Sequence, residues 1–192
     1  KEQLANYIEI LVKVVQDAIS DEDDEVRRLA SQCFQNLYNA VGSRTLEEIV
    51  PSLLVAMESE DDDTKARALN GMAGILSVRS RELFPYIIPR LLKPPLTANH
   101  ADALGSISEA TPQTIHTNFN RIVPTFISEL AAFSDIDMDD EEKEREEAIR
   151  RNFSTLCRNV DTVGVHILIS EISNKCISDK ESVRKESCWS YQ

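Results

Sequence analysis

Apolar residues recur along the chain at the three- and four-residue spacing of amphipathic α-helices. The first such stretch runs from Leu4 to Ile19, and its apolar residues share one helical face. A second stretch runs from Asp24 to Val41, with acids that supply an N-cap before it and Gly42 as a stop after it. The apolar stripe of this second stretch consists of Val26, Leu29, Ala30, Cys33, Leu37 and Val41. Together the two stretches predict a helix pair.

Three further pairs and part of a fourth follow. They are predicted at about 45–58 with 62–78, 81–92 with 97–110, 113–133 with 142–160, and 162 onward with a last helix near 179. A pair with one apolar stripe per helix cannot bury both stripes alone, so the pairs must stack on one another. The predicted fold class is all-α, a right-handed α-solenoid of about five helix pairs with the last one incomplete.

A short motif repeats in the first helix of successive pairs. Two apolar residues, a proline, a polar residue and another apolar residue recur around Pro51, Pro89 and Pro124, with 38 and 35 residues between the prolines. The strings Asp24–Arg27 and Asp62–Lys65 are also offset by 38 residues. Two markers with one period indicate a structural repeat. We expect repeats at about 4–42, 44–78, 79–110, 111–160 and, in part, 161–192, within one domain.

The charge of the chain is strongly negative but unevenly spread. The net charge is −12, yet residues 64–133 carry 7 basic against 4 acidic side chains. Such an acidic chain is not expected to bind nucleic acid, because affinity for a phosphate backbone comes from clustered Lys and Arg. No apolar run approaches the roughly 18 residues of a membrane span. We therefore expect a cytoplasmic protein that does not contact a membrane.

Residues that could support catalysis or metal binding are scattered. The four cysteines have no paired short spacing, which favours reduced thiols over a zinc site or a disulfide framework. The three histidines lie far apart, and no glycine loop for phosphate is present. The acidic turns at 21–25 and 58–63 lack the spacing of a calcium loop. We expect no enzyme activity, no cofactor and no metal.

The repeated proline and the start of the second helix resemble a known repeat type. HEAT repeats often carry a proline in the first helix and open the second helix with Asp-x-x-Val-Arg. Residues Asp23–Arg27 match that opening, whereas Lys180–Arg184 keeps only the Val-Arg part. The chain therefore resembles a stack of HEAT repeats.

Longer strings narrow the resemblance. Residues 38–43, 46–54 and 76–89, with the close 93–96, resemble the carboxy-terminal HEAT-repeat, RWD-binding region of the general control non-derepressible translational activator family. The resemblance covers about residues 1–130. It implies a ribosome-associated scaffold that binds the RWD domain of the amino-acid-starvation kinase, which phosphorylates a translation initiation factor, and for which other RWD-domain proteins compete. It also implies that other parts of a longer protein contact the ribosome.

A different kind of HEAT scaffold is the alternative. A transport-receptor-like solenoid would bind basic cargo or a small GTPase with its concave face. Both hypotheses describe binding proteins, and they differ only in the partner.

Basic residues at the openings of the second helices allow two interpretations. They could face a partner. Alternatively, each could bond the turn aspartates of its own or the next repeat, and we favour this second interpretation. The residues are Arg27, Lys65, Arg150 and Arg184. Arg28 and Arg67 point elsewhere around their helices, which makes them better candidates for partner binding.

The remaining candidates cluster around one first helix. Arg79, Arg81, Arg90 and Lys93 lie where basic side chains outnumber acidic ones, and guanidinium groups pair well with carboxylates. We expect this face to meet an acidic patch on the RWD domain. The run 135–147, with 9 acids and 2 bases, is interpreted as a solvated loop continuing into a helix, or as a surface for a basic partner.

Overall fold

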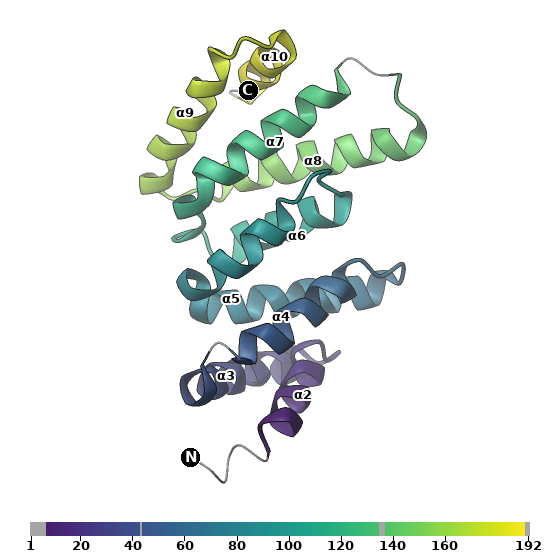
Figure 1. The fold of residues 1–192 in the computed structure, drawn as a ribbon, viewed down its shortest axis with the longest axis vertical. Helices are drawn as coiled ribbons and strands as arrows, with labels where there is room; N and C mark the ends of the chain where they lie inside the picture. The colour runs from purple at the N-terminus through teal and green to yellow at the C-terminus, as the bar shows by residue number, and fades with distance from the viewer. Residues whose placement is uncertain (1–6, 43, 135–136, 191–192) are drawn as a thin grey trace. The chain divides into compact units, whose positions relative to one another are not determined.

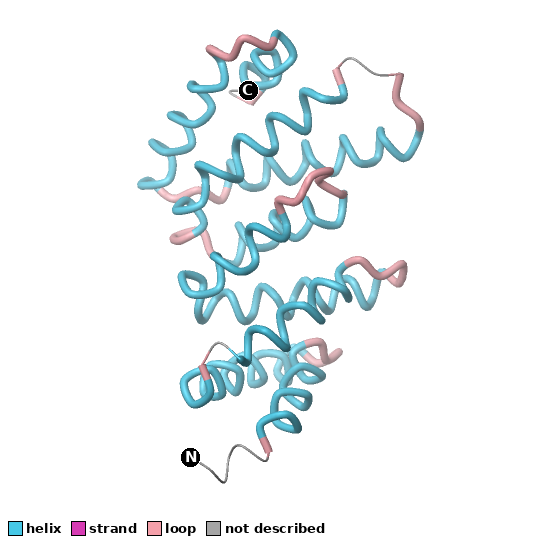
Figure 2. Tube along the Cα trace, viewed as in Figure 1, coloured by secondary structure: helices cyan, strands magenta, loops and turns pink. Residues whose placement is uncertain are grey.

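The structure, a computed structural model, describes residues 7–42, 44–134 and 137–190. Within these ranges it contains helices and no strand, as Figure 2 shows. The all-α prediction is confirmed. In chain order the elements are α2 (Ile8–Ile19), α3 (Asp24–Val41), α4 (Arg44–Met57), α5 (Asp62–Leu91), α6 (Ala98–Ala110), η1 (Ile115–Asn118), α7 (Phe119–Phe133), α8 (Asp140–Arg158), α9 (Thr162–Cys176) and α10 (Glu181–Trp189).

Short polar side chains determine where several helices begin. Asp23 accepts hydrogen bonds from two backbone N–H groups of α3, and Thr97 and Asp161 accept one each from α6 and α9. Asp139 and Glu142 form a reciprocal capping box at the start of α8. Because these caps satisfy N–H groups that have no partner inside the helix, they fix the helix starts within two residues of the predicted positions.

Residues Lys1–Leu83 form the first of two compact units. Helix α2 packs along α3, and α4 packs against both (Figure 1). Gly71 of α5 lies so close to α2 that a Cβ added there would be 2.6 Å from Cγ2 of Ile19. The core of this unit is apolar and includes Ile19, Phe34, Ile49, Met57 and Met72.

Residues Phe84–Gln192 form the second unit. Helix α6 packs on α8, α7 packs on α8 and α9, and α10 packs on α7 and α9 (Figure 1). The rings of Phe126 and Phe153 stack with their centroids 5.4 Å apart, between α7 and α8. Each unit is therefore a stack of helix pairs, which is the α-solenoid class that the sequence predicts.

Helix α5 contains the two helices that the sequence predicts at 62–78 and 81–92, joined across a kink. It runs from Asp62 to Leu91, and its one residue with non-helical angles is Arg79, with φ −141° and ψ 42°. The break thus lies at the predicted junction. No glycine or proline stands between Val78 and Arg81, so the two helices are joined by a kink at one residue and not by a loop.

Two boundaries differ from the prediction. The predicted helix 113–133 is divided into a 3₁₀ turn at Ile115–Asn118 and α7 from Phe119 onward. The acidic run predicted as loop then helix at 142 becomes helical already at Asp140, because the capping box begins one residue earlier. Residues 1–6 and 135–136 of the predicted elements lie outside the described residues.

Candidate protein-binding surface

The basic residue at the fourth position of the second helices pairs with an acid one turn earlier. Arg27 pairs with Asp24, Lys65 with Asp62 at 3.3 Å, and Lys143 with Asp140 at 3.2 Å. Each acid is almost fully exposed, so each pair contributes on the order of 0–1 kcal/mol. These bases serve their own helix ends, as the favoured interpretation holds.

Arg27 and Arg184 share a second feature at this position. Nη1 of Arg27 donates to the carbonyl oxygens of Asp21 and Glu22, at 2.6 and 3.0 Å. Nη1 of Arg184 donates to the carbonyl oxygens of Ser178 and Asp179, at 2.7 and 3.0 Å. In both units the guanidinium group therefore closes the turn that leads into its helix.

The prediction that Arg150 lies at the opening of a second helix is wrong. It lies in the middle of α8, and the residue at the equivalent position is Lys143. Both carboxylate oxygens of Glu186 on α10 accept hydrogen bonds from Arg150, at 2.8 and 3.1 Å. The guanidinium also stands 4.7 Å from the centre of the Trp189 ring. Arg150 thus joins α8 to α10, because the long connection after α7 shifts the start of α8 relative to the repeat period.

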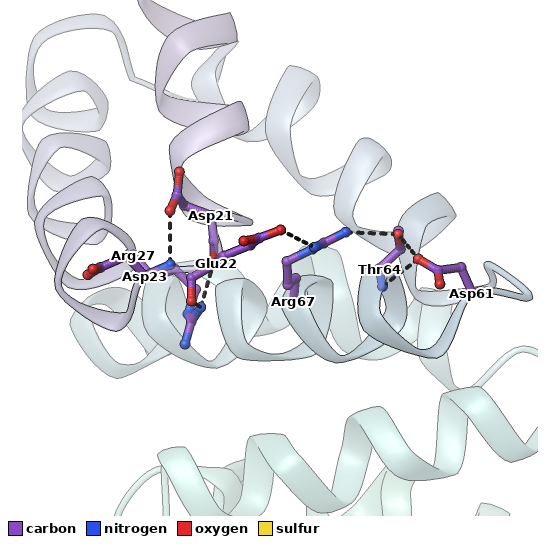
Figure 3. A network of polar contacts seen from close by, with 7 residues as sticks. All are labelled: Asp21, Glu22, Asp23, Arg27, Asp61, Thr64 and Arg67. Carbon is purple, nitrogen blue, oxygen red and sulfur yellow. Dashed lines mark hydrogen bonds and ion pairs between the residues drawn. The ribbon is translucent and has the colours of Figure 1, made fainter.

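Arg67 joins two helix pairs in the first unit, as Figure 3 shows. Its Nη1 lies 3.4 Å from Oε1 of Glu22, in the turn before α3, and its Nη2 lies 3.2 Å from Oγ1 of Thr64. The Thr64 N–H in turn donates to the carboxylate of Asp61 at 2.9 Å. The Arg67 side chain is 31% exposed, whereas Glu22 is 89% exposed. Arg67 therefore connects α5 to the turn before α3 at the edge of the first unit.

Arg79 is also engaged inside the first unit. It donates hydrogen bonds to Oδ1 of Asn39 and, at 3.1 Å, to Oε1 of Glu82. Its guanidinium lies 5.5 Å from the centre of the Tyr38 ring. Arg79 therefore holds the non-helical point of α5 against α3.

The other four candidates are exposed. Arg28 pairs with Glu25 of its own helix at 2.5–2.8 Å, and this hydrogen bond lowers the pKa of Glu25. Arg81 is exposed in α5, and no partner of its side chain is recorded within the described residues. Arg90 donates weakly to the carbonyl of Tyr86, at 3.3 Å, one turn before Lys93.

The candidates do not form one cluster in the first unit. Arg28 lines a hollow of about 290 Å³ with Asn70 and Gly74 of α5. Arg67 lines a different hollow, of about 440 Å³, with Asp21 and Glu22. Arg90 lies in the last turn of α5 and Lys93 two residues after its end, both in the second unit.

A second exposed surface, on α3, was not anticipated from the sequence. Ala30 and Leu37 of the predicted stripe are buried, but Val26 is 37% and Leu29 46% exposed, and Cys33 is exposed. The stripe therefore has two sides, and only one of them faces the core.

The exposed side of α3 occupies a defined place in the repeat. Leu29 lies six residues after its N-cap, and Arg67 lies six residues after Asp61. Arg67 is the residue that contacts the preceding helix pair. Leu29 thus occupies the same helix position as Arg67, the residue that contacts the preceding helix pair in the next repeat.

Titratable side chains in the second unit bring few groups together. His116 Nδ1 lies 3.3 Å from Oδ1 of Asp161, which also caps α9. Burial raises the pKa of the Cys157 thiol to about 11. Over the part of the chain that the structure describes, no three metal-ligating side chains gather at one place. No helix in that part has the length and apolar character needed to cross a bilayer.

The sequence is similar to a family of long proteins. Residues 83–192, more than half of the chain, match the model of the family described as "Stalled ribosome sensor GCN1-like, HEAT repeats". The four strings that suggested such a family all lie before residue 97, so the match extends the resemblance to the carboxy-terminal half.

Individual relatives carry corresponding names. The chain is 27% identical over 189 residues to the eIF-2-alpha kinase activator GCN1 of Dictyostelium discoideum, covering 98% of this chain and 7% of that protein. It is 30% identical over 179 residues to the protein of the same name from Saccharomyces cerevisiae, covering 93% and 6%. The Stalled ribosome sensor GCN1 of Mus musculus is 32% identical over 102 residues, covering 53% and 4%.

The chain therefore spans less than a tenth of the length of these relatives. The helix pairs, the repeat period and the family match agree with one another. This chain belongs to the GCN1-like family of HEAT-repeat proteins.

Proposed function

We propose that this chain is a protein-binding scaffold segment that docks the RWD domain of the starvation-response kinase and thereby couples ribosome stalling to kinase activation. Two relatives are named kinase activators, and a third is named a stalled ribosome sensor. We also propose that it acts without catalysis, in the cytoplasm, with ribosome contacts made by other parts of a longer protein.

The observation that carries the proposal is exposed positive charge in an otherwise acidic chain. Residues 64–133 hold 7 bases and 4 acids against a net charge of −12. Arg81, Arg90 and Lys93 lie exposed in this stretch, and no carboxylate within the described residues is recorded as their partner. Such groups gain most from a carboxylate on a partner, because pairing does not first require an internal bond to break.

The six candidates then divide by what they already contact. We propose that Arg81, Arg90 and Lys93 contact the RWD domain directly, and that Arg28 does so after exchanging its bond to Glu25. Arg67 and Arg79 are bonded inside the stack, so we propose that their effect on binding is mainly through the shape of the surface.

A pull-down with the kinase's RWD domain tests this assignment. Arg81→Glu and Arg90→Glu should each reduce capture, because they replace attraction by repulsion at an interface. Arg121→Glu is the matched control, since Arg121 is an exposed arginine of α7 with no recorded side-chain partner within the described residues. Circular dichroism should show equal helix content for all three variants.

Equal capture by the three variants would contradict the proposed surface, and no capture of the RWD domain by the wild-type chain would contradict the function itself. A small GTPase in a parallel arm addresses the transport-receptor alternative, because capture of the GTPase without the RWD domain would favour it.

A further inference from the structure

Two cysteine side chains meet at the end of the second unit. Cys176 is the last residue of α9, and Cys188 lies in α10. The two thiols are neighbours, and Cys188 contributes to the raised pKa of Cys176. Both line one surface hollow of about 540 Å³, and both are free thiols.

The fold of the last helix pair produces this meeting. Helices α9 and α10 pack on each other and are joined by a short turn at 177–180 (Figure 1). Residues Glu181, Arg184, Lys185 and Cys188 follow helical spacing, so they share one face of α10. All four line the hollow together with Cys176. The face of α10 that carries Cys188 is therefore the face that Cys176 meets.

We propose that Cys176 and Cys188 form a dithiol modification site that a hydroperoxide closes into a disulfide. One thiolate attacks the peroxide and becomes a sulfenic acid as the hydroxide or alkoxide leaves. The second sulfur then attacks the first, and water leaves as the S–S bond forms. In total two thiols lose two protons and two electrons, and the hydroperoxide is reduced to water or to water and an alcohol.

The two remaining cysteines have different surroundings. Cys33 is exposed on α3 and belongs to the first unit. Cys157 lines another hollow, with Phe153 and Ser154, and its burial suppresses the thiolate. Because only a thiol with a second thiol beside it can close an internal disulfide, the reaction is specific to the pair Cys176 and Cys188.

The raised pKa of Cys176 favours the protonated form of its thiol at neutral pH. Burial and the neighbouring Cys188 raise the pKa of Cys176, since a second negative sulfur nearby would be repelled. We therefore expect disulfide formation to accelerate as pH rises from neutral. The disulfide would link the end of α9 covalently to α10, across the turn in which Ile177 is exposed.

Peptide mass mapping of the full chain after mild hydrogen peroxide treatment tests the proposal. The expected result is a peptide pair joined through Cys176 and Cys188, lighter by two hydrogens, which a thiol reductant separates. Cys188→Ser should abolish the joined pair, while the control Cys33→Ser should retain it. Separate over-oxidation of Cys176 and Cys188, or joining of either to Cys33, would overturn the proposal.

A second probe needs no oxidant. Phenylarsine oxide binds two neighbouring thiols through one arsenic atom with release of water, so it should block alkylation of Cys176 and Cys188 together. The Cys188→Ser variant should lose this protection at Cys176. Protection of Cys176 that persists in Cys188→Ser would show that the two sulfurs do not act as a pair.

Discussion

Arg67 and Arg145 occupy the same position of their helices, six residues after the N-caps Asp61 and Asp139, and each reaches back to the turn before the preceding second helix. Arg67 contacts Glu22, and Nε of Arg145 donates to the carbonyl oxygen of Leu96 at 2.7 Å. The two units therefore use the same helix position for the contact between neighbouring pairs. The two repeats therefore share the position of this contact, although Arg67 meets a carboxylate and Arg145 a backbone carbonyl.

This contact predicts a loss of stability for Arg145→Ala. The Arg145 side chain also binds Glu129, which is 13% exposed, and lies 5.0 Å from the centre of the Phe133 ring. Its removal leaves the Leu96 carbonyl and a shielded carboxylate without their partner, which costs about 1–3 kcal/mol. Urea unfolding followed by circular dichroism measures the change.

Arg151→Ala is the matched control for this prediction. Arg151 pairs with Asp102 at 2.7 Å, but its side chain is 62% exposed, so its removal should cost only about 0–1 kcal/mol. Equal losses in the two variants would mean that the contact at Leu96 adds nothing beyond a surface ion pair.

A close helix approach makes Gly71 sensitive to substitution. In Gly71→Ala the new Cβ would stand 2.6 Å from Cγ2 and 2.8 Å from the carbonyl oxygen of Ile19. Because Ile19 is fully buried, α2 must move, which we expect to cost about 1–3 kcal/mol. Asn70→Ala, at an exposed neighbouring position of α5, should change the free energy of unfolding little. Thermal unfolding of both variants compares them, and a Gly71→Ala chain as stable as wild type would refute the close packing.

The buried thiol of Cys157 predicts a loss of stability at high pH. Its pKa is raised from 9.0 to about 11 by burial, so folding favours the protonated thiol. The stabilising contribution is complete below pH 9 and is lost as pH rises toward 11, by on the order of 2–3 kcal/mol. The free energy of unfolding should therefore fall less steeply between pH 8 and 11 for Cys157→Ala than for the wild-type chain. Parallel curves for the two proteins would exclude Cys157 as the source.

The sequence predicted the helices well because their signals are local. The repeated prolines and the aspartate before α3 each lie within or next to the helix that they mark. They can therefore be recognised without knowing any distant contact. The same local signals failed at Arg150, where the length of the connection changes the register.

The side-chain partners were less predictable. Helical spacing placed Arg67 away from Lys65 but could not show which group of the preceding pair it meets, because that depends on how the pairs stack. The exposure of Leu29 has the same origin, since a stripe of apolar residues does not show how much of it a neighbour covers. The division of 1–192 into five repeats of one domain and the handedness of the stack stay predictions.

The central claim is that exposed bases of this chain bind an RWD domain by charge, and calorimetric titration at low and high salt tests it most directly. We predict that the wild-type chain binds the kinase's RWD domain, that added salt weakens binding because the paired charges are screened, and that Arg81→Glu lowers the affinity by about tenfold while Arg121→Glu does not. Affinity that is independent of salt and equal in both variants, or no binding at all, would contradict this account.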